Sequence, residues 1–156
     1  CQVDGPMYAF HTHQANALRS DAMIYSPDVP VFRGDDHQLL EEPYKVAFLS
    51  AAACDARDVA PLDQPKIAGA MGARIVKVLA AAQANGHDAL VLGAWGCGNF
   101  ANDPGLIAEL FRQALHGPFR GAFRHVTFAI VDPSADQPCL HQFRLALSPQ
   151  APRGHN

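Results

Sequence analysis

Three short, uninterrupted apolar runs constrain the fold of this chain more than any other feature of its sequence. They occupy residues 45–50 (KVAFLS), 89–94 (ALVLGA) and 125–131 (HVTFAIV). Such runs are typical of strands buried on both faces of a parallel sheet, whereas a strand with one solvated face alternates apolar and polar residues. The sequence therefore predicts a sheet built around three buried strands.

Each predicted strand is followed by a segment with helical character. Residues 64–85 carry apolar side chains at three- and four-residue spacing, and Gly86 follows as a C-terminal stop. Asp103 and Pro104 are a favourable N-cap and first residue for a helix that reaches about residue 116. Residues 139–147 predict a terminal helix. This alternation indicates an α/β fold with a mainly parallel sheet.

The remaining segments fit one domain. Residues 22–25 and 29–32 are β-prone, and the prolines that follow or interrupt them favour extended backbone. Glu41 and Glu42 precede a proline and predict a solvated turn. We expect a single domain over residues 1–147 and a flexible polar tail over residues 148–156.

The composition argues against several classes of function. Hydrophobic residues make up 49% and charged residues 17% of the chain, which is typical of globular proteins. The net charge is -3 and the 12 Lys and Arg residues form no basic run, so binding to duplex nucleic acid is not expected. No apolar run approaches the roughly 20 residues of a membrane-spanning helix. The 4 cysteines are widely spaced and form no CxxC pair, which favours the cytoplasm: Cys1, Cys54, Cys97 and Cys139.

The loop at residues 93–100 (GAWGCGNF) is the most informative stretch for function. It joins a buried strand to a capped helix, and its small residues allow backbone N–H groups to approach a phosphate beside the helix N-terminus. Ligands of open α/β sheets bind at the carboxyl ends of strands, where this loop lies. The alternative is a tight turn whose glycines only satisfy backbone geometry. The combination of strand, glycines and capped helix favours phosphate binding.

Other candidate residues carry weaker signals. His11 and His13 could ligate a metal from one strand face, but no third ligand is evident, and ordinary surface histidines are the simpler interpretation. Cys97 could be a nucleophile at a helix N-terminus, although no partner base is implied. Trp95 is expected to anchor the loop by packing. Three phenylalanines are expected in or near the core: Phe119, Phe123 and Phe128.

Several motifs together resemble those of the bacterial-type poly(ADP-ribose) glycohydrolases. Residues 93–104 (GAWGCGNFANDP) resemble a signature of that family, as do residues 23–33 (MIYSPDVPVFR) and 40–49 (LEEPYKVAFL). Residues 125–132 resemble the last strand of its sheet. The order and spacing also match, so the resemblance covers nearly all of residues 7–147. It implies a macrodomain, a three-layer α/β/α fold with a mainly parallel mixed sheet.

The resemblance also implies roles for individual residues. The diphosphate of ADP-ribose would be held by backbone groups of the loop, Phe100 would pack against the distal ribose, and Cys97 would be a small loop residue. Asp132 and Pro133 would lie where macrodomains close over the adenosine, although a plain strand-ending turn is equally consistent with them. The substrate-binding residues expected from this resemblance are Gly96, Cys97, Gly98, Asn99, Phe100, Asp132 and Pro133.

The family's catalytic element is a GGG stretch followed by a Gln-Glu-Glu triplet, and neither is present here. Glu41 and Glu42 belong to a different motif, so no catalytic residue is assigned within this chain. The sequence starts at Cys1 and not at a methionine. Because the triplet precedes the MIYSPDVPVFR motif in the family, we expect the acid glutamate to lie upstream of Cys1. The chain is then expected to begin just after the catalytic segment and to be inactive alone.

For the complete protein we expect hydrolysis of ribose–ribose glycosidic bonds, with neither metal nor cofactor. Such hydrolysis needs a positioned carboxyl group that protonates the leaving oxygen. Two alternatives remain. One is a non-catalytic ADP-ribose-binding module, because the loop is present while the acid is not. The other, less favoured, is a generic Rossmann-like module.

Overall fold

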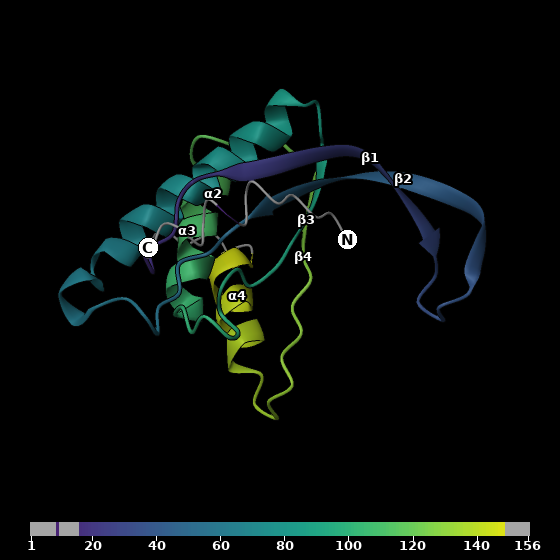
Figure 1. Ribbon diagram of the computed structural model, residues 1–156. Coiled ribbons are helices and arrows are strands. Elements are labelled where there is room, and N and C mark those ends of the chain that lie inside the picture. Colours follow the sequence, from purple (N-terminus) through teal and green to yellow (C-terminus); the bar gives the residue numbers. More distant parts are fainter. Residues whose placement is uncertain (1–8, 10–15, 149–156) are drawn as a thin grey trace, which may run out of the picture.

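The computed structural model describes residue 9 and residues 16–148 of the 156-residue chain. A long hairpin, formed by β1 (Met23–Arg33) and β2 (Leu39–Ala51), precedes a body of helices and two short strands. In Figure 1 this hairpin crosses the body and then arches away from it.

Several expectations concern the two ends of the chain, and these ends are not described. The predicted tail lies outside the described residues, except for Ser148, and so do His11 and His13. Cys1 also lies outside them. The expectation that the catalytic glutamate lies upstream of Cys1 therefore stays a prediction, as does the domain boundary at residue 1.

The helices pack together on one side of the body and supply most of the core. They are α2 (Lys66–Ala84), α3 (Pro104–His116) and α4 (Pro138–Leu147), with a short 3-10 helix, η1 (Pro61–Asp63), before α2. The predicted stripe on α2 is confirmed, because its buried residues recur every three or four positions. The largest apolar core side chains are fully buried: Met71, Ile75, Leu79, Ile107 and Phe111.

The strands β3 (Ala89–Leu92) and β4 (His125–Phe128) form a parallel pair against these helices. Phe128 faces the helices and lies 5.2 Å from the Phe111 ring and 5.4 Å from the Phe143 ring, between centroids. On the opposite face Val91 is 78% exposed. The prediction that β3 is buried on both faces is therefore wrong for the described residues, which place no helix against the face that carries Val91.

The strand predicted at residues 45–50 forms part of β2, but its environment differs from the prediction. It pairs antiparallel with β1, and most of its residues are exposed, including Phe48 at 50%. Its apolar run predicted two buried faces, yet the described residues cover little of either. Glu41 and Glu42, expected in a turn, lie within the same strand. Burial depends on what packs against a strand, which an apolar run does not specify.

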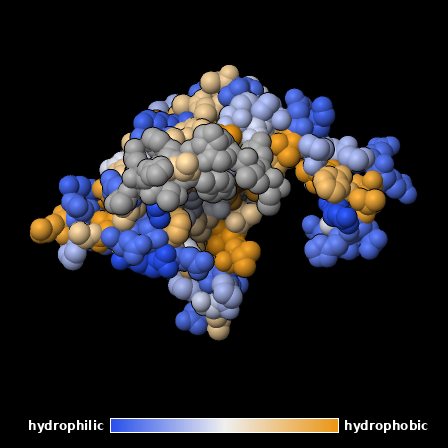
Figure 2. Space-filling view, in the orientation of Figure 1, coloured by the Kyte–Doolittle hydropathy of each residue, from blue (hydrophilic) through white to orange (hydrophobic). Residues whose placement is uncertain are grey.

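A groove of about 860 Å³ separates the hairpin from β3 and the C-terminal end of α2. The described strands form two separate two-stranded sheets, and β2 is not paired with β3. Figure 2 shows the hairpin as a projecting arm with the surface hollowed beneath it. The hydroxyl of Tyr25 bridges the two parts through a hydrogen bond of 2.9 Å to His87 Nε2. Leu92 lines the groove, which therefore reaches the residue before the loop of residues 93–100, called the glycine loop from here on.

By length and composition alone, α2 could span a membrane, and it is the one described helix that could. Its packing indicates a different role. The helix buries one face against the core and carries the charged side chain of Arg74 in that buried face. A buried stripe of this kind is typical of a core helix in a globular domain.

The uneven burial of the body generates a stability prediction. Ile75→Ala removes a side chain with no exposed surface and should lower the free energy of unfolding by about 2–5 kcal/mol. Val91→Ala should change it by no more than about 0.5 kcal/mol, because that side chain is mostly solvated. Urea unfolding followed by circular dichroism measures both. Equal losses would show that the outer face of β3 is covered in solution.

Candidate functional site

The glycine loop follows the carboxyl end of β3, and residues 101–103 join it to the start of α3. Asp103 caps α3, accepting a hydrogen bond of 2.6 Å from the backbone N–H of Leu106, and Pro104 is the first helical residue. Both features were predicted from the sequence and are confirmed. The cap ties the loop to the N-terminal end of α3, where the helix dipole favours an anion.

The loop is closed by its own backbone hydrogen bonds. The N–H of Cys97 donates to Ala94 O at 3.0 Å, and the N–H of Ala101 donates to Gly98 O at 2.9 Å. The intervening N–H groups have no acceptor among the described residues: Gly98, Asn99 and Phe100. Three consecutive free donors beside a helix N-terminus form a potential anion-binding site.

Asn102 fixes the inner side of the loop. It is 2% exposed, and its side-chain amide donates to Cys54 O at 2.8 Å and to Gly96 O at 3.0 Å. Its Oδ1 has no partner among the described residues. Asn102 thereby ties the loop to the segment that follows β2. This role could not be predicted from the sequence, because the main partner of Asn102 is 48 residues away.

Gly96 is required by this arrangement. Its φ is +77°, and a Cβ at this position would lie 2.7 Å from Ala53 Cβ and closer still to the Asn102 amide nitrogen. Gly98 differs, since a Cβ there would meet nothing within 4 Å. Of the two glycines, Gly96 holds the loop in shape, and Gly98 leaves open space in front of its backbone.

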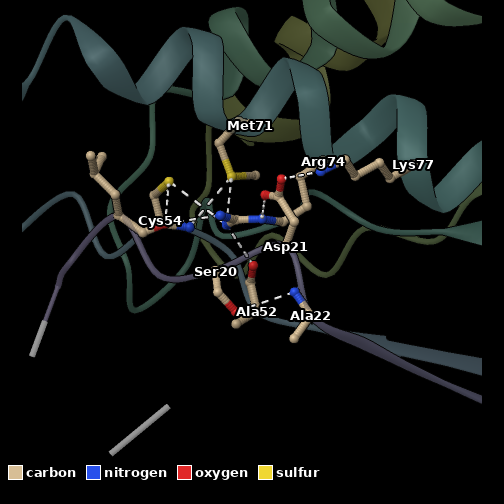
Figure 3. Close-up of polar contacts among 9 residues, drawn as sticks. Ser20, Asp21, Ala22, Ala52, Cys54, Met71, Arg74 and Lys77 are labelled. Carbon is tan, nitrogen blue, oxygen red and sulfur yellow. Dashed lines mark hydrogen bonds and ion pairs between the residues drawn. The ribbon is translucent and has the colours of Figure 1, made fainter. Parts of the chain in front are cut away.

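The segment after β2 is in turn held by Arg74 of α2, as Figure 3 shows. Arg74 is 1% exposed and donates to Ala52 O at 2.7 Å and to Leu18 O at 3.0 Å. Its Nε lies 3.2 Å from a carboxylate oxygen of Asp21, which also pairs with Lys77. Hydrogen bonding from Lys77 is the main reason that the pKa of Asp21 lies below its ordinary value. Arg74 therefore supports the loop indirectly.

Cys97 is not suited to be a nucleophile. Burial, together with the neighbouring Cys139 thiol, raises the pKa of Cys97 to about 12. A thiol with this pKa is almost entirely protonated at neutral pH, and the thiolate is the reactive form. The geometry therefore favours the interpretation of Cys97 as a small loop residue.

Phe100 ends the loop beside an ion pair. The Arg57 guanidinium lies 5.8 Å from the centre of the Phe100 ring. Arg57 also donates two hydrogen bonds, of 2.9 and 2.8 Å, to the carboxylate of Asp55, which is 2% exposed. These bonds are the largest cause of the lowered pKa of Asp55. The neighbouring backbone is joined by a bond of 2.9 Å from Ala56 N–H to Phe100 O.

Asp132 occupies a turn at the start of α4. Its carboxylate accepts hydrogen bonds from the backbone N–H groups of Cys139 at 2.8 Å and Leu140 at 3.2 Å. It thus caps α4 in place of Gln137, which makes no side-chain cap. The Cys139 thiol interacts with that of Cys97, so this turn adjoins the glycine loop. The predicted role of Asp132 and Pro133 at the adenosine stays a prediction.

Three carboxylates near the loop already have partners. Asp55 pairs with Arg57, while Asp103 and Asp132 cap helices. Within residues 16–148, no group of three metal-ligating side chains is found. Trp95, Phe123 and Phe128 pack against the core, and Phe119 is buried within it, as expected from the sequence.

Comparisons with known proteins identify the relatives of this chain. A model of the microbial-type PARG catalytic domain, named for poly(ADP-ribose) glycohydrolase, matches residues 1–34. A mutant poly(ADP-ribose) glycohydrolase from Deinococcus radiodurans, crystallised with ADP-ribose, is 42% identical with a TM-score of 0.87. The match covers 92% of this chain and 59% of that one. The Deinococcus enzyme in apo form matches with 42% identity and a TM-score of 0.84, over 91% of this chain and 59% of that one.

A mutant poly(ADP-ribose) glycohydrolase from Thermomonospora curvata is 49% identical, with a TM-score of 0.85. That match covers 90% of this chain and 54% of the Thermomonospora chain. The chain belongs to the bacterial poly(ADP-ribose) glycohydrolase family. It spans less than two thirds of the length of these relatives. No curated protein matches it.

Membership of the glycohydrolase family confirms the α/β macrodomain expected from the sequence motifs. The described strands supply an antiparallel and a parallel pair, consistent with part of a mixed sheet. The glycine loop, one of the motifs on which the resemblance rests, also carries the three free backbone donors described above. The predicted binding residues other than the Asp132 turn are thus concentrated in one loop.

A buried arginine generates the first prediction for this site. Arg74→Met leaves two partly buried carbonyls without their donor and should lower the free energy of unfolding by about 3–5 kcal/mol. Lys77→Met removes the other partner of Asp21 but is a matched control, because the Lys77 side chain is 54% exposed. It should cost at most about 1 kcal/mol. Chemical denaturation compares them, and similar losses would contradict the assigned role of Arg74.

The two loop glycines generate a second prediction. Gly96→Ala places a Cβ against Ala53 and Asn102 in a left-handed backbone conformation, and should cost about 1–3 kcal/mol of stability. Gly98→Ala should change stability by no more than about 0.5 kcal/mol. Thermal unfolding of both variants checks this difference. A destabilised Gly98→Ala variant would show that the space in front of Gly98 is filled.

Proposed function

We propose that this chain binds ADP-ribose, with the diphosphate held by the loop of residues 96–100. The observation that carries the proposal is the run of free N–H groups at Gly98, Asn99 and Phe100 beside the N-terminus of α3. Backbone donors at such a position suit a phosphate oxygen. The proposal is supported by the Deinococcus relative, which was crystallised with ADP-ribose.

We further propose that this binding serves the hydrolysis of ribose–ribose bonds in poly(ADP-ribose). Such hydrolysis needs a carboxyl group placed to protonate the leaving oxygen. Three carboxylates near the loop, those of Asp55, Asp103 and Asp132, are engaged by Arg57 or by helix caps. We therefore propose that the acid comes from outside the described site, and we expect no appreciable hydrolysis by the 156-residue chain itself.

A second candidate function is recognition of ADP-ribose without hydrolysis. The engagement of Asp55, Asp103 and Asp132 favours it, because the loop is intact while these three carboxylates beside it are already bound. Incubation with poly(ADP-ribose) separates the two functions, since only hydrolysis releases free ADP-ribose. For either function we propose a cytoplasmic location, which the free thiols of Cys54, Cys97 and Cys139 support.

Binding should depend on the loop backbone and not on the Cys97 thiol. Gly98→Val fills the open space in front of the free donors and should weaken ADP-ribose binding at least about tenfold without unfolding the chain. Cys97→Ser is the matched control, because it keeps the size of the side chain and should bind within about twofold of the unsubstituted chain. Isothermal titration calorimetry measures both affinities.

Several outcomes would contradict the proposal. Undiminished binding by Gly98→Val would place the diphosphate elsewhere. Equal losses in the two variants would give the Cys97 side chain a role that its raised pKa does not suggest. No binding of ADP-ribose by the unsubstituted chain would contradict the proposed function itself.

A further inference from the structure

The glycine loop supplies hydrogen-bond donors but no charge. Residues 96–100 contain no charged side chain, and the chain as a whole has a net charge of -3. A diphosphate ligand is an anion, and hydrogen bonds from a charged donor to an anion are roughly twice as strong as neutral ones. A nearby cation with free donors would therefore add substantially to binding at this loop.

Arg57 is such a cation. It contacts the end of the loop through the Phe100 ring, at 5.8 Å from its centre, and its side chain is 53% exposed. Asp55 accepts one hydrogen bond from Nε and one from Nη2. A guanidinium has five N–H donors, so three remain, including both on Nη1. None of these has an acceptor among the described residues.

The environment of Arg57 fixes its orientation. Asp55 is buried, and its own backbone N–H donates to Ala17 O at 2.8 Å, so the carboxylate is a rigid partner. The bidentate pair and the ring contact together restrict a side chain that would otherwise be mobile. A guanidinium that is already oriented loses less entropy when it binds a phosphate.

Two other described arginines, Arg74 and Arg124, are engaged elsewhere. Arg74 is buried and directs its donors to Asp21, Ala52 and Leu18. Arg124 lies beside the first residue of β4, at the end of the sheet opposite to the loop, and pairs with Asp88 at 3.0 Å. Arg124 is therefore a suitable control, as an exposed arginine in a comparable ion pair away from the loop.

We propose that Arg57 binds a phosphate oxygen of the ligand at the mouth of the loop, held in position by Asp55 and Phe100. The proposal rests on the proposed function, because it assumes that the loop binds a diphosphate. It adds a charged side chain to a site otherwise built from backbone groups. The chemical class of ligand is an organic or inorganic diphosphate.

The test uses the 156-residue chain and two ligands, ADP-ribose and inorganic pyrophosphate. Affinities are measured by calorimetry at several salt concentrations for the unsubstituted chain, Arg57→Gln, Arg57→Lys and Arg124→Gln. Arg57→Gln should bind both ligands about tenfold more weakly and with a shallower dependence on salt. Arg57→Lys should bind both ligands with intermediate affinity, since lysine keeps the charge but lacks the planar, forked guanidinium. Arg124→Gln should match the unsubstituted chain, and melting temperatures exclude unfolding.

Pyrophosphate separates the failure of this proposal from that of the proposed function. If the chain binds pyrophosphate through Arg57 but does not bind ADP-ribose, the proposed function fails and the role of Arg57 stands. If Arg57→Gln loses affinity for ADP-ribose only, Arg57 positions Phe100 and the phosphate contact is overturned. Unchanged affinities in Arg57→Gln, or no binding of either ligand by the unsubstituted chain, also overturn it.

Discussion

The buried guanidinium of Arg74 is the interaction on which the rest of this structure depends. It joins α2 to the chain on both sides of the hairpin, through Asp21 and Leu18 before β1 and Ala52 after β2. A buried charge is tolerated only when it is paired and hydrogen-bonded, so these segments must adopt their positions together. The base of the hairpin is thereby fixed to the core, although its outer part is solvated.

The attachment of this segment to Arg74 also determines the geometry of the candidate site. The segment fixed by Arg74 continues to Cys54, whose carbonyl accepts from Asn102, and Asn102 in turn holds Gly96. The same segment then leads to Asp55 and Arg57, which contact the far end of the loop at Phe100. The loop is thus held at both ends by one stretch of chain, an arrangement that limits the rearrangement needed when a ligand binds.

Features set by local sequence could be predicted, and features set by distant contacts could not. Asp103 and Pro104 define the start of α3 through bonds within one helical turn, and the spacing of Ile67, Met71 and Ile75 defines the buried face of α2. The glycine loop was identified because its residues are contiguous. By contrast, the carbonyls that bind Arg74, and the Cys54 carbonyl that binds Asn102, lie 22 to 56 residues away. The exposure of apolar strand residues was also missed, since an apolar run does not state how many of its faces are covered.

The separation of the hairpin from β3 has a consequence for how the molecule unfolds. Near Tyr25 the hairpin is anchored by its bond to His87 and by the Arg74 contacts at its base. Toward Arg33 and Leu39, its described support is the pairing of the two strands with each other. Isolated two-stranded ribbons are marginally stable in water. The tip of the hairpin and its base therefore belong to different cooperative units. Backbone amides near the base should be protected from hydrogen exchange more strongly than those near the tip, although both lie in the same pair of strands.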